Sequence, residues 1–540
     1  MSKRDFDSLK FETFDLIVVG GGIMGAGIAR DAALRGIHTL LLEKQDFASG
    51  TTSRSSRLIH GGLRYLQHFD FSLVRQGLRE REILLSIASH LVHPCSFIVP
   101  MNSTSQRVAL AFGLPLYDML SFDKSLPSRQ RLTRHETIEM EPDLELKGLK
   151  GSYLYYDCQA PFVERLCLEN VIAAAELGAS PVNYAEVTGL QRLGSSVSGV
   201  QVRDVLSGEA YEVRSRFVVN ATGHWAQSVV EMMGTGSPPI VRRSKGIHIV
   251  TPQISRHAIA MFSIAKGRHF FIIPWLDYSL IGITDTEYSG DLDIVEAKKE
   301  DVVYVLEGVR EAFPSLELGD VLYTVAGLRA LADSGSRSTR DLSRKYEVID
   351  HEKKDGVGGF ISVLGGKITA YRAVAEDTVN LVCRKLGLKT LSSTAQIPLP
   401  GAPAPSQEAM EQAALESGLS MHTITHLGNL YGSRFRRVLD LVKKDARGGQ
   451  NLCPHSPDIL AQVWYSIDEG AITLSDFLLR RSTVGMRSCQ GLDASDTIAR
   501  EMGRLLGWSP AEQLRQVEDY RNAAAVGQGF RWETDDIGRK

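Results

Sequence analysis

The chain has 540 residues, which is more than one hydrophobic core usually supports, so we expect two or three domains. Hydrophobic residues make up 43% and charged residues 23%, an ordinary globular composition that excludes a disordered, collagen-like or disulfide-stabilised chain. The formal net charge of −3 gives the chain as a whole no electrostatic footprint for nucleic acid, so no nucleic-acid partner is expected.

Cysteine usage and apolar segments indicate a reduced compartment and no membrane span. None of the six cysteines forms a Cys-x-x-Cys pair, which favours the cytoplasm. The first residues are charged and have no apolar core, so they do not predict a secretory signal. The longest apolar stretch, residues 108–117, contains Pro115 and is about half as long as a spanning helix. We expect a cytoplasmic protein, and any membrane contact would be peripheral, on the inner face of the cell membrane.

A strand, a glycine turn and a helix open the chain. Residues 15–19 predict a buried strand, residues 26–34 a helix and residues 38–42 a second strand. Three such elements within about 30 residues form a βαβ unit, which implies a parallel sheet.

The glycine turn carries a dinucleotide-binding pattern. Gly20, Gly22 and Gly25 fit G-x-G-x-x-G, in which the glycines permit a tight turn, close approach of a pyrophosphate and close helix packing. Glu43 ends the second strand, 23 residues after Gly20, where a carboxylate accepts hydrogen bonds from ribose hydroxyls. A glycine-rich turn without a ligand does not explain all of these features together.

Two later segments favour FAD over NAD as the dinucleotide. Residues 51–62 form a polar, glycine-ended loop directly after the ribose carboxylate, where a plain nicotinamide domain would continue with its next helix. Residues 217–223 place a buried strand before a small Ala-Thr-Gly turn, which lets the backbone pass close to a bound dinucleotide.

Further strands and helices follow irregularly, up to a late strand at residues 360–364 and a long helix at 368–386. We predict an α/β fold, with an FAD-binding Rossmann-like domain built from discontinuous segments, an inserted, mostly antiparallel sheet as a cap domain, and a C-terminal helical domain. The expected boundaries are 14–95, 150–235 and 335–390 for the FAD-binding domain, 96–149 and 236–334 for the substrate or cap domain, 391–406 for a proline-rich linker and 407–540 for the helical domain.

Several stretches resemble one family, the FAD-dependent, membrane-associated and quinone-linked glycerol-3-phosphate dehydrogenases, within the glutathione-reductase-like and D-amino-acid-oxidase-like flavoproteins. The resemblance is most specific in Ile-His-Gly-Gly-Leu-Arg-Tyr at residues 59–65 and covers nearly the whole chain. It implies oxidation of sn-glycerol 3-phosphate to dihydroxyacetone phosphate by hydride transfer from carbon 2 to FAD, with electrons passed to a membrane quinone. Other matching stretches are residues 245–250, 281–285, 327–329, 343–346 and 365–372.

The resemblance also implies roles for individual residues. Arg64, Tyr65 and Arg344 are expected to bind the substrate, because guanidinium groups offer planar, bidentate donors to phosphate. His248 is the candidate base for the hydroxyl proton, and a satisfied core histidine is the alternative. Arg329 and Lys367 would place positive charge near the developing alkoxide and the reduced flavin. The expected FAD site consists of Gly20, Gly22, Gly25, Glu43, Thr52, Ser53, Ser55, Ser56, His60, Gly61, Ala221, Gly223, Gly366, Lys367 and Thr369.

Four positions depart from the family pattern. Ala330 and His224 stand where the family usually has proline, and Ala370 and Ile283 stand where threonine is commoner. None of these changes removes a charged group, but Ala370 and Ile283 leave the substrate choice open.

The C-terminal domain resembles that of the anaerobic branch of the family, whose module carries an iron–sulfur cluster on four cysteines. This chain has only Cys453 and Cys489 there, with His455 and Ala494 where further ligands would fall. Two thiolates do not make a four-cysteine site, so we predict no cluster and no metal.

The electron acceptor and the assembly stay open. Residues 100–134 combine basic and apolar side chains, which suits peripheral contact with anionic lipid, and an ordinary surface loop is the alternative. The sequence does not decide whether the chain forms a homodimer. The alternative functions are a peroxide-forming glycerol-3-phosphate oxidase, an FAD-dependent dehydrogenase of 2-hydroxy acids or amino acids and, from another class, an RNA-modifying flavoprotein.

Overall fold

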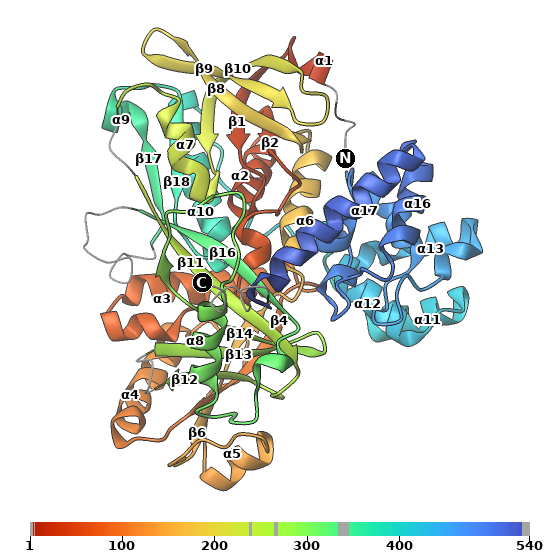
Figure 1. The fold of residues 1–540 in the computed structure, drawn as a ribbon. Coiled ribbons are helices and arrows are strands. Elements are labelled where there is room, and N and C mark those ends of the chain that lie inside the picture. The colour runs from red at the N-terminus through yellow and green to blue at the C-terminus, as the bar shows by residue number, and fades with distance from the viewer. Residues whose placement is uncertain (1–3, 5, 237–239, 264–267, 333–344, 532–540) are drawn as a thin grey trace, which may run out of the picture.

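The computed structural model describes residues 4, 6–236, 240–263, 268–332 and 345–531, except for a few side chains within them. Two sheet-based parts are stacked one above the other, and a helical part lies at their side (Figure 1). This is the α/β architecture predicted from the sequence, with a parallel sheet, a second mixed sheet and a C-terminal helical region.

The first sheet carries the predicted βαβ unit. Its parallel strands are joined at one edge by an antiparallel strand, β17. The predicted strand–helix–strand of residues 15–42 is confirmed as β1, α2 and β2. The strand order is β17 (Glu347–Asp350), β18 (Phe360–Leu364), β10 (Ala210–Asn220), β1 (Thr13–Val19), β2 (Thr39–Leu42) and β7 (Ser180–Val182).

Both faces of this sheet are buried, which explains the continuous apolar run of β1. Leu16 and Val18 belong to the core on the side of the long helices, whereas Ile17 and Val19 belong to the core on the opposite side. The first face is covered by α2 (Ile23–Leu34), α6 (Val163–Glu176) and α10 (Tyr371–Leu386), and the second by the hairpin of β8 (Ala185–Leu193) and β9 (Ser196–Asp204) with α7 (Ala226–Glu231).

The second sheet is mostly antiparallel, with one parallel pair between β12 and β4. Its strands are β3 (Leu58–Ile59), β4 (His93–Pro100), β5 (Gln130–Leu132), β6 (Ser152–Gln159), β11 (Val241–Pro252), β12 (Ala258–Ser263), β13 (Arg268–Trp275), β14 (Tyr278–Gly282), β15 (Thr286–Glu287) and β16 (Tyr323–Ala332).

Strands of the second sheet extend into sequence ranges expected for the FAD-binding domain, and the domain boundaries themselves stay a prediction. β3 and β6 fall in ranges assigned from the sequence to the FAD-binding domain, yet both pair within the second sheet. The reason is that an apolar pattern reveals a strand but not its hydrogen-bonding partner, and β6 pairs along its whole length with β4.

The remaining helices before the C-terminal part are divided between the two sheets, and α9 contacts β17 and β18 of the first sheet. Residues 299–309 form α8, which packs on β11 and β13 of the second sheet. The helices are α1 (Phe6–Leu9), α3 (Phe71–Ile87), α4 (Thr104–Leu120), α5 (Arg134–Met140), α8 (Lys299–Val309) and α9 (His351–Asp355).

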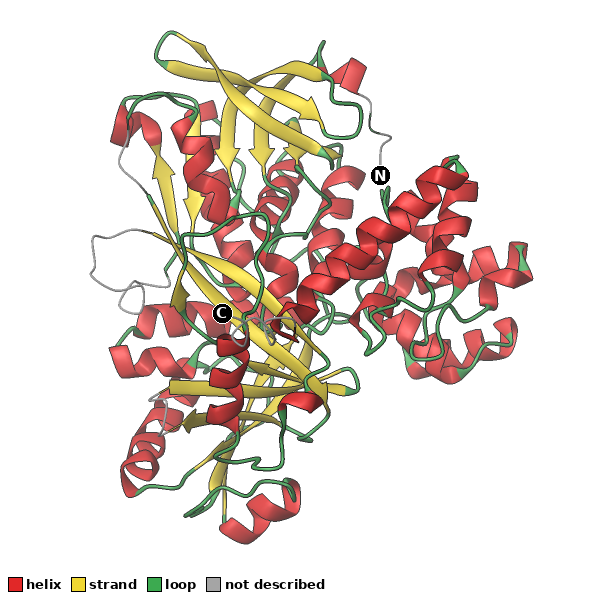
Figure 2. Cartoon of the chain, viewed as in Figure 1, coloured by secondary structure: helices red, strands yellow, loops and turns green. Residues whose placement is uncertain are grey.

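The C-terminal part consists of helices and loops (Figure 2). The proline-rich segment before it lies against the first part, since the Leu399 amide donates to the Ile87 carbonyl at 2.8 Å. The last described segment, Val526–Arg531, returns to β16, where Thr324 Oγ1 donates to the Gly527 carbonyl at 3.0 Å. The helices are α11 (Gln407–Ser417), α12 (Met421–Tyr431), α13 (Phe435–Lys444), α14 (Leu460–Asp468), α15 (Leu474–Asp476), α16 (Ser495–Leu506) and α17 (Pro510–Ala525).

Candidate active site

A cavity of about 1280 Å³ lies where the two sheets meet. On one side it is lined by residues that directly follow β1, β2, β10 and β18, namely Gly20, Glu43, Ala221 and Gly365. On the other side it is lined by residues of β11, β13 and β16. The carboxyl edge of a parallel sheet is where α/β proteins bind ligands, because the loops that leave the strands meet there.

The glycine turn is packed too tightly for side chains at two of its positions. A Cβ on Gly25 would lie 1.8 Å from the Gly20 carbonyl oxygen, and a Cβ on Gly20 would lie 2.8 Å from the Ala221 carbonyl oxygen. Gly20 also has a φ of +105°, a conformation that L side chains rarely adopt. The backbone therefore approaches the cavity closely, as a dinucleotide site requires.

Glu43 is held in place by two backbone amides. The Gly21 amide donates to Oε2 at 2.6 Å and the Gln45 amide donates to Oε1 at 2.8 Å. Burial raises the pKa of this carboxyl above its usual value. Because a carboxylate oxygen has two lone pairs, Glu43 can still accept hydrogen bonds from a diol in the cavity.

Some residues of the polar loop after Glu43 line the cavity, and others do not. Thr52 lines the cavity, and its Oγ1 accepts from the Ile23 amide at 3.0 Å, at the start of α2. Ser53 instead donates to the Gly50 carbonyl at 3.2 Å. The expected FAD residues that line the cavity are Gly20, Gly22, Glu43, Thr52, Ser55, Ser56, His60, Ala221, Gly223, Gly366 and Lys367, whereas Gly25, Ser53, Gly61 and Thr369 are not among its lining residues.

Thr369 supports the cavity from behind. It is fully buried, and its Oγ1 accepts from the His60 amide at 3.0 Å. The helix expected from residue 368 begins as a 3₁₀ turn, Ile368–Ala370, and becomes α-helical at Tyr371. Lys367, just before this turn, reaches the cavity.

Two cations border the cavity from opposite sheets. Lys367 Nζ donates to the Gly61 carbonyl at 3.0 Å and lies 4.6 Å from the centre of the Tyr65 ring. Burial lowers the pKa of Lys367 to about 8. Arg329 donates to the Thr284 carbonyl at 2.9 Å and pairs with Asp285 at 3.4 Å.

The guanidinium of Arg329 lies close to Gly246 of the neighbouring strand β11, two residues from Ser244, which is the strand partner of Arg329. A Cβ on Gly246 would lie 2.3 Å from a terminal nitrogen of the Arg329 guanidinium and 3.0 Å from Ile283 Cδ1. Ile283, one of the departures from the family pattern, also lines the cavity. It therefore contributes to the shape of the pocket next to the guanidinium.

The two histidines of the predicted site take different positions. His60 lines the cavity directly, whereas His248 is not among the lining residues and lies behind Ser56. His248 Nε2 and Ser56 Oγ are 2.9 Å apart, and His248 Nδ1 is buried without a hydrogen-bond partner in the described part of the chain. Burial lowers the pKa of both imidazoles to about 3, helped at His60 by Lys367 and at His248 by Arg329. Both are therefore neutral at physiological pH.

Two predicted substrate residues cannot be placed. The side chain of Arg64 and the whole of Arg344 lie outside the described residues. Tyr65 lines the cavity beside Lys367, and so does Lys345, which follows Arg344 and pairs with Asp70 at 3.2 Å.

Arg54 is a further cation of the cavity that was not predicted from the sequence. It lines the cavity within the polar loop, where a Cβ on Gly327 would lie 2.8 Å from its Cβ. Burial lowers the pKa of its guanidinium below the usual value. Its place between Ser53 and Ser55, in a loop already expected to bind the cofactor, was the available signal.

Similarity to known proteins agrees with this geometry. Residues 15–372 match the family of FAD dependent oxidoreductases, and residues 392–513 match the C-terminal domain of alpha-glycerophosphate oxidase. A glycerol-3-phosphate dehydrogenase of Synechocystis sp. is 39% identical, over 96% of this chain and 97% of its own. The chain belongs to the FAD-dependent glycerol-3-phosphate dehydrogenase family.

Two other members of this family extend the comparison. The human mitochondrial glycerol-3-phosphate dehydrogenase is 33% identical, over 97% of this chain and 75% of that protein. The structure of a glycerol-3-phosphate dehydrogenase from Bacillus halodurans complexed with FAD has a TM-score of 0.81 at 28% identity and covers 98% of both chains. The predicted family, fold class and FAD cofactor are thereby confirmed.

Proposed function

We propose that this chain oxidises sn-glycerol 3-phosphate to dihydroxyacetone phosphate and passes the electrons to a membrane quinone. The observation that supports this function most is the shared cavity, which joins a dinucleotide turn and Glu43 to a group of cations and the neutral His60, with the neutral His248 behind Ser56. Members of the same family that are named glycerol-3-phosphate dehydrogenases match nearly the whole chain.

The residues present fit FAD. The glycine turn, the Thr52 loop and the amides that begin α2 would hold the pyrophosphate, and Glu43 would accept from the ribose hydroxyls. When bound, FAD supplies the acceptor for the hydride that leaves carbon 2 of the substrate.

The cations of the cavity suit a dianionic substrate. We assign the phosphate to the neighbourhood of Arg64, Tyr65 and Arg344, as the resemblance implies. Arg329 and Lys367 then face the reacting end, where positive charge stabilises an alkoxide as it forms. Asp285 and the Thr284 carbonyl fix the direction of the Arg329 guanidinium, so little reorganisation is needed during the reaction.

The activity is tested by anaerobic titration of the FAD-loaded chain. We expect sn-glycerol 3-phosphate to bleach the flavin absorbance, and glycerol, 2-hydroxy acids and amino acids to leave it unchanged at the same concentration. A water-soluble quinone should then restore the absorbance faster than air does.

Three results would contradict the proposal. Equal bleaching by a 2-hydroxy acid or an amino acid would show a different substrate. One peroxide formed for each substrate oxidised in air, even with the quinone present, would show an oxidase. A salt-sensitive RNA complex without any bleaching would favour the RNA-modifying alternative.

We infer that His248 takes the hydroxyl proton through Ser56. Ser56 Oγ lines the cavity and is 2.9 Å from His248 Nε2, so the serine can pass its own proton to the imidazole and receive one from the substrate. The unpartnered Nδ1 of His248 supports a role beyond packing, because a buried polar atom without a partner destabilises the fold. His60 is the competing base, since it reaches the cavity without an intermediary.

Substitution of each histidine separates the two assignments. His248→Ala should slow flavin reduction at least ~100-fold, the low end for removal of a general base, while the flavin stays bound. Ser56→Ala should slow it similarly, and His60→Ala should slow it less than either. Stopped-flow bleaching at saturating sn-glycerol 3-phosphate measures all three. A full rate in His248→Ala together with a slow His60→Ala variant would transfer the base role to His60.

Deprotonation of Lys367 should lower the activity at alkaline pH. Its pKa of about 8 means that the ammonium is charged below pH 8 and loses its charge as the pH rises through that value. Since kcat/KM reports the free enzyme, it should fall with a midpoint near pH 8, by at most about tenfold per pH unit. In Lys367→Arg the guanidinium stays charged, so this alkaline fall should move out of the measured range. The same midpoint in both proteins would exclude Lys367 as its cause.

Helix α4 supports a route for the quinone. Its inner face is anchored by the buried Leu114 and Tyr117, and its outer face exposes Val108, Phe112 and Met119. Phe112 is 76% exposed and also lines the cavity, as does Phe69, which is 78% exposed. An apolar surface that borders the cavity would bring a lipid-soluble acceptor near the flavin. No helix within the described ranges is long and apolar enough to span a bilayer.

The basic side chains near α4 contribute less to the attraction of anionic lipid than the sequence suggests. Lys124 and Arg129 both pair with Asp118, at 2.7 and 2.5 Å, so their charges are partly compensated. Contact with a membrane would therefore depend mainly on the apolar side chains of α4.

The double variant Phe69→Ser and Phe112→Ser tests this surface. It should lower binding to anionic phospholipid vesicles at least ~10-fold, because each buried Phe contributes about 1.5–3 kcal/mol. Co-sedimentation measures the binding, and Leu415→Ser is the control, because Leu415 is 81% exposed on α11 of the helical part. Equal sedimentation of the double variant, the control and the wild type would reject this membrane surface.

A further inference from the structure

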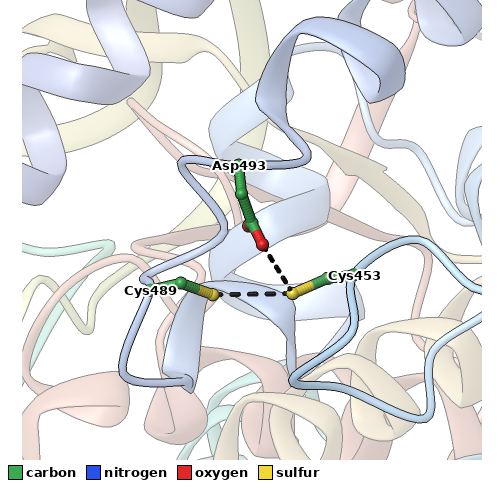
Figure 3. Close-up of side chains that lie close together, drawn as sticks. All are labelled: Cys453, Cys489 and Asp493. Atoms are coloured by element: carbon green, nitrogen blue, oxygen red, sulfur yellow. Dashed lines mark hydrogen bonds between the residues drawn. The ribbon is translucent and has the colours of Figure 1, made fainter.

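Two cysteines and a carboxylate meet in the helical part, outside the cavity. Cys453 Sγ lies 3.5 Å from Cys489 Sγ and 3.3 Å from Asp493 Oδ2 (Figure 3). The three ligand atoms all lie within 4.8 Å of one another. Cys453 is buried, Cys489 is half-buried and Asp493 is exposed, so the group opens to solvent on the carboxylate side.

The separations suit a tetrahedral cation. Ligands that bind Zn²⁺ at about 2.1–2.3 Å lie roughly 3.6–3.8 Å apart along the edges of the tetrahedron. The observed 3.5 and 3.3 Å are slightly shorter than these edges. Thiolate and carboxylate are also ligands that Zn²⁺ accepts.

Each sulfur receives a backbone hydrogen bond, which is a second and independent observation. The His455 amide donates to Cys453 Sγ at 3.4 Å, and the Gly491 amide donates to Cys489 Sγ at 3.4 Å. In both cases the donor is two residues after the cysteine. Such bonds fix the direction of the sulfur and stabilise its negative charge, as the groups around metal ligands do.

We propose that Cys453, Cys489 and Asp493 form a binding site for one divalent cation of the zinc type. Binding replaces the two thiol protons, which go to solvent, and no electron is transferred. A water completes the tetrahedron, because no other His, Cys, Asp or Glu of the described residues joins the group.

The proposal departs from the sequence prediction of no metal. That prediction considered cysteines as cluster ligands and did not consider Asp493, four residues after Cys489. An iron–sulfur cluster would still need four thiolates, and Cys453 and Cys489 supply two.

The site would stabilise a loop of the helical part that contacts the second sheet. Within this loop the Met486 carbonyl accepts from Tyr323 at 2.6 Å, Arg487 pairs with Asp277 at 2.8 Å, and the Ser488 amide donates to Tyr278 at 2.9 Å. A cation on Cys489 and Asp493 would connect the end of this loop to Cys453, on the segment before α14.

Co²⁺ binding to the FAD-loaded chain tests the site. After reduction of the thiols and removal of metals with a chelator, one Co²⁺ per chain should produce thiolate-to-cobalt charge-transfer absorption, and Zn²⁺ should abolish it. Binding should strengthen as the pH rises, because protons are released. Cys453→Ser and Cys489→Ser should lose the absorption, and Asp493→Asn should weaken the affinity at least ~10-fold.

Matched controls and thermal stability complete the experiment. Cys95→Ser, in β4, and Asp496→Asn, in α16, should bind Co²⁺ as the wild type does. Zn²⁺ should raise the thermal midpoint of the wild type but not that of Asp493→Asn, whose exposed side chain can change without loss of the fold.

Two outcomes would overturn the proposal. The first is unchanged cobalt absorption in both cysteine variants. The second is a reduced wild type that binds no Co²⁺ yet loses two thiols when treated with glutathione disulfide, which would identify the cysteines as a redox pair instead.

Discussion

The parallel arrangement of β1, β2, β10 and β18 is the constraint on which the site depends. Parallel strands end at the same edge of a sheet, so residues from four distant parts of the chain meet there. The glycine turn, Glu43, the Ala-Thr-Gly turn and the Gly-Gly pair before Lys367 are each placed by this rule. The second sheet then closes the cavity from the opposite side and contributes Arg329.

The cavity brings buried cations close to the neutral His60, and the neutral His248 lies behind Ser56. Burial lowers the pKa of Lys367, Arg54 and both histidines, and the low values of the histidines are reinforced by the cations nearby. These groups disfavour positive charge on one another. A dianion in the cavity would offset that repulsion and raise the pKa of Lys367, Arg54 and the histidines toward their usual values. We therefore expect the binding of a dianion and the proton affinity of these histidines to be coupled through charge.

Sequence patterns predicted the first sheet better than the second. The βαβ unit has a fixed length, a glycine turn and a carboxylate at a set distance, so β1, α2 and β2 could be located from local information. The partners of β3 and β6 are set by contacts far along the chain, which no local pattern encodes. The same limit applies to the site. Glu43 and Lys367 follow motif positions, whereas the place of His248 behind Ser56 and the meeting of Cys453 with Asp493 depend on tertiary packing.

The buried carboxylate of Asp46 has a consequence for the whole molecule. It lies three residues after Glu43, in the loop that borders the dinucleotide site, and it pairs with Arg480 and Arg481 of the helical part at 2.5 Å. Burial raises the pKa of Asp46, but the charges of Arg481 and Arg480 outweigh that effect and hold it below the usual value. Removing one partner of such a pair costs about 3–5 kcal/mol. The stability of the helical part is therefore coupled to that of the cofactor loop. Because such coupling is reciprocal, a ligand that stabilises the loop also stabilises the helical part.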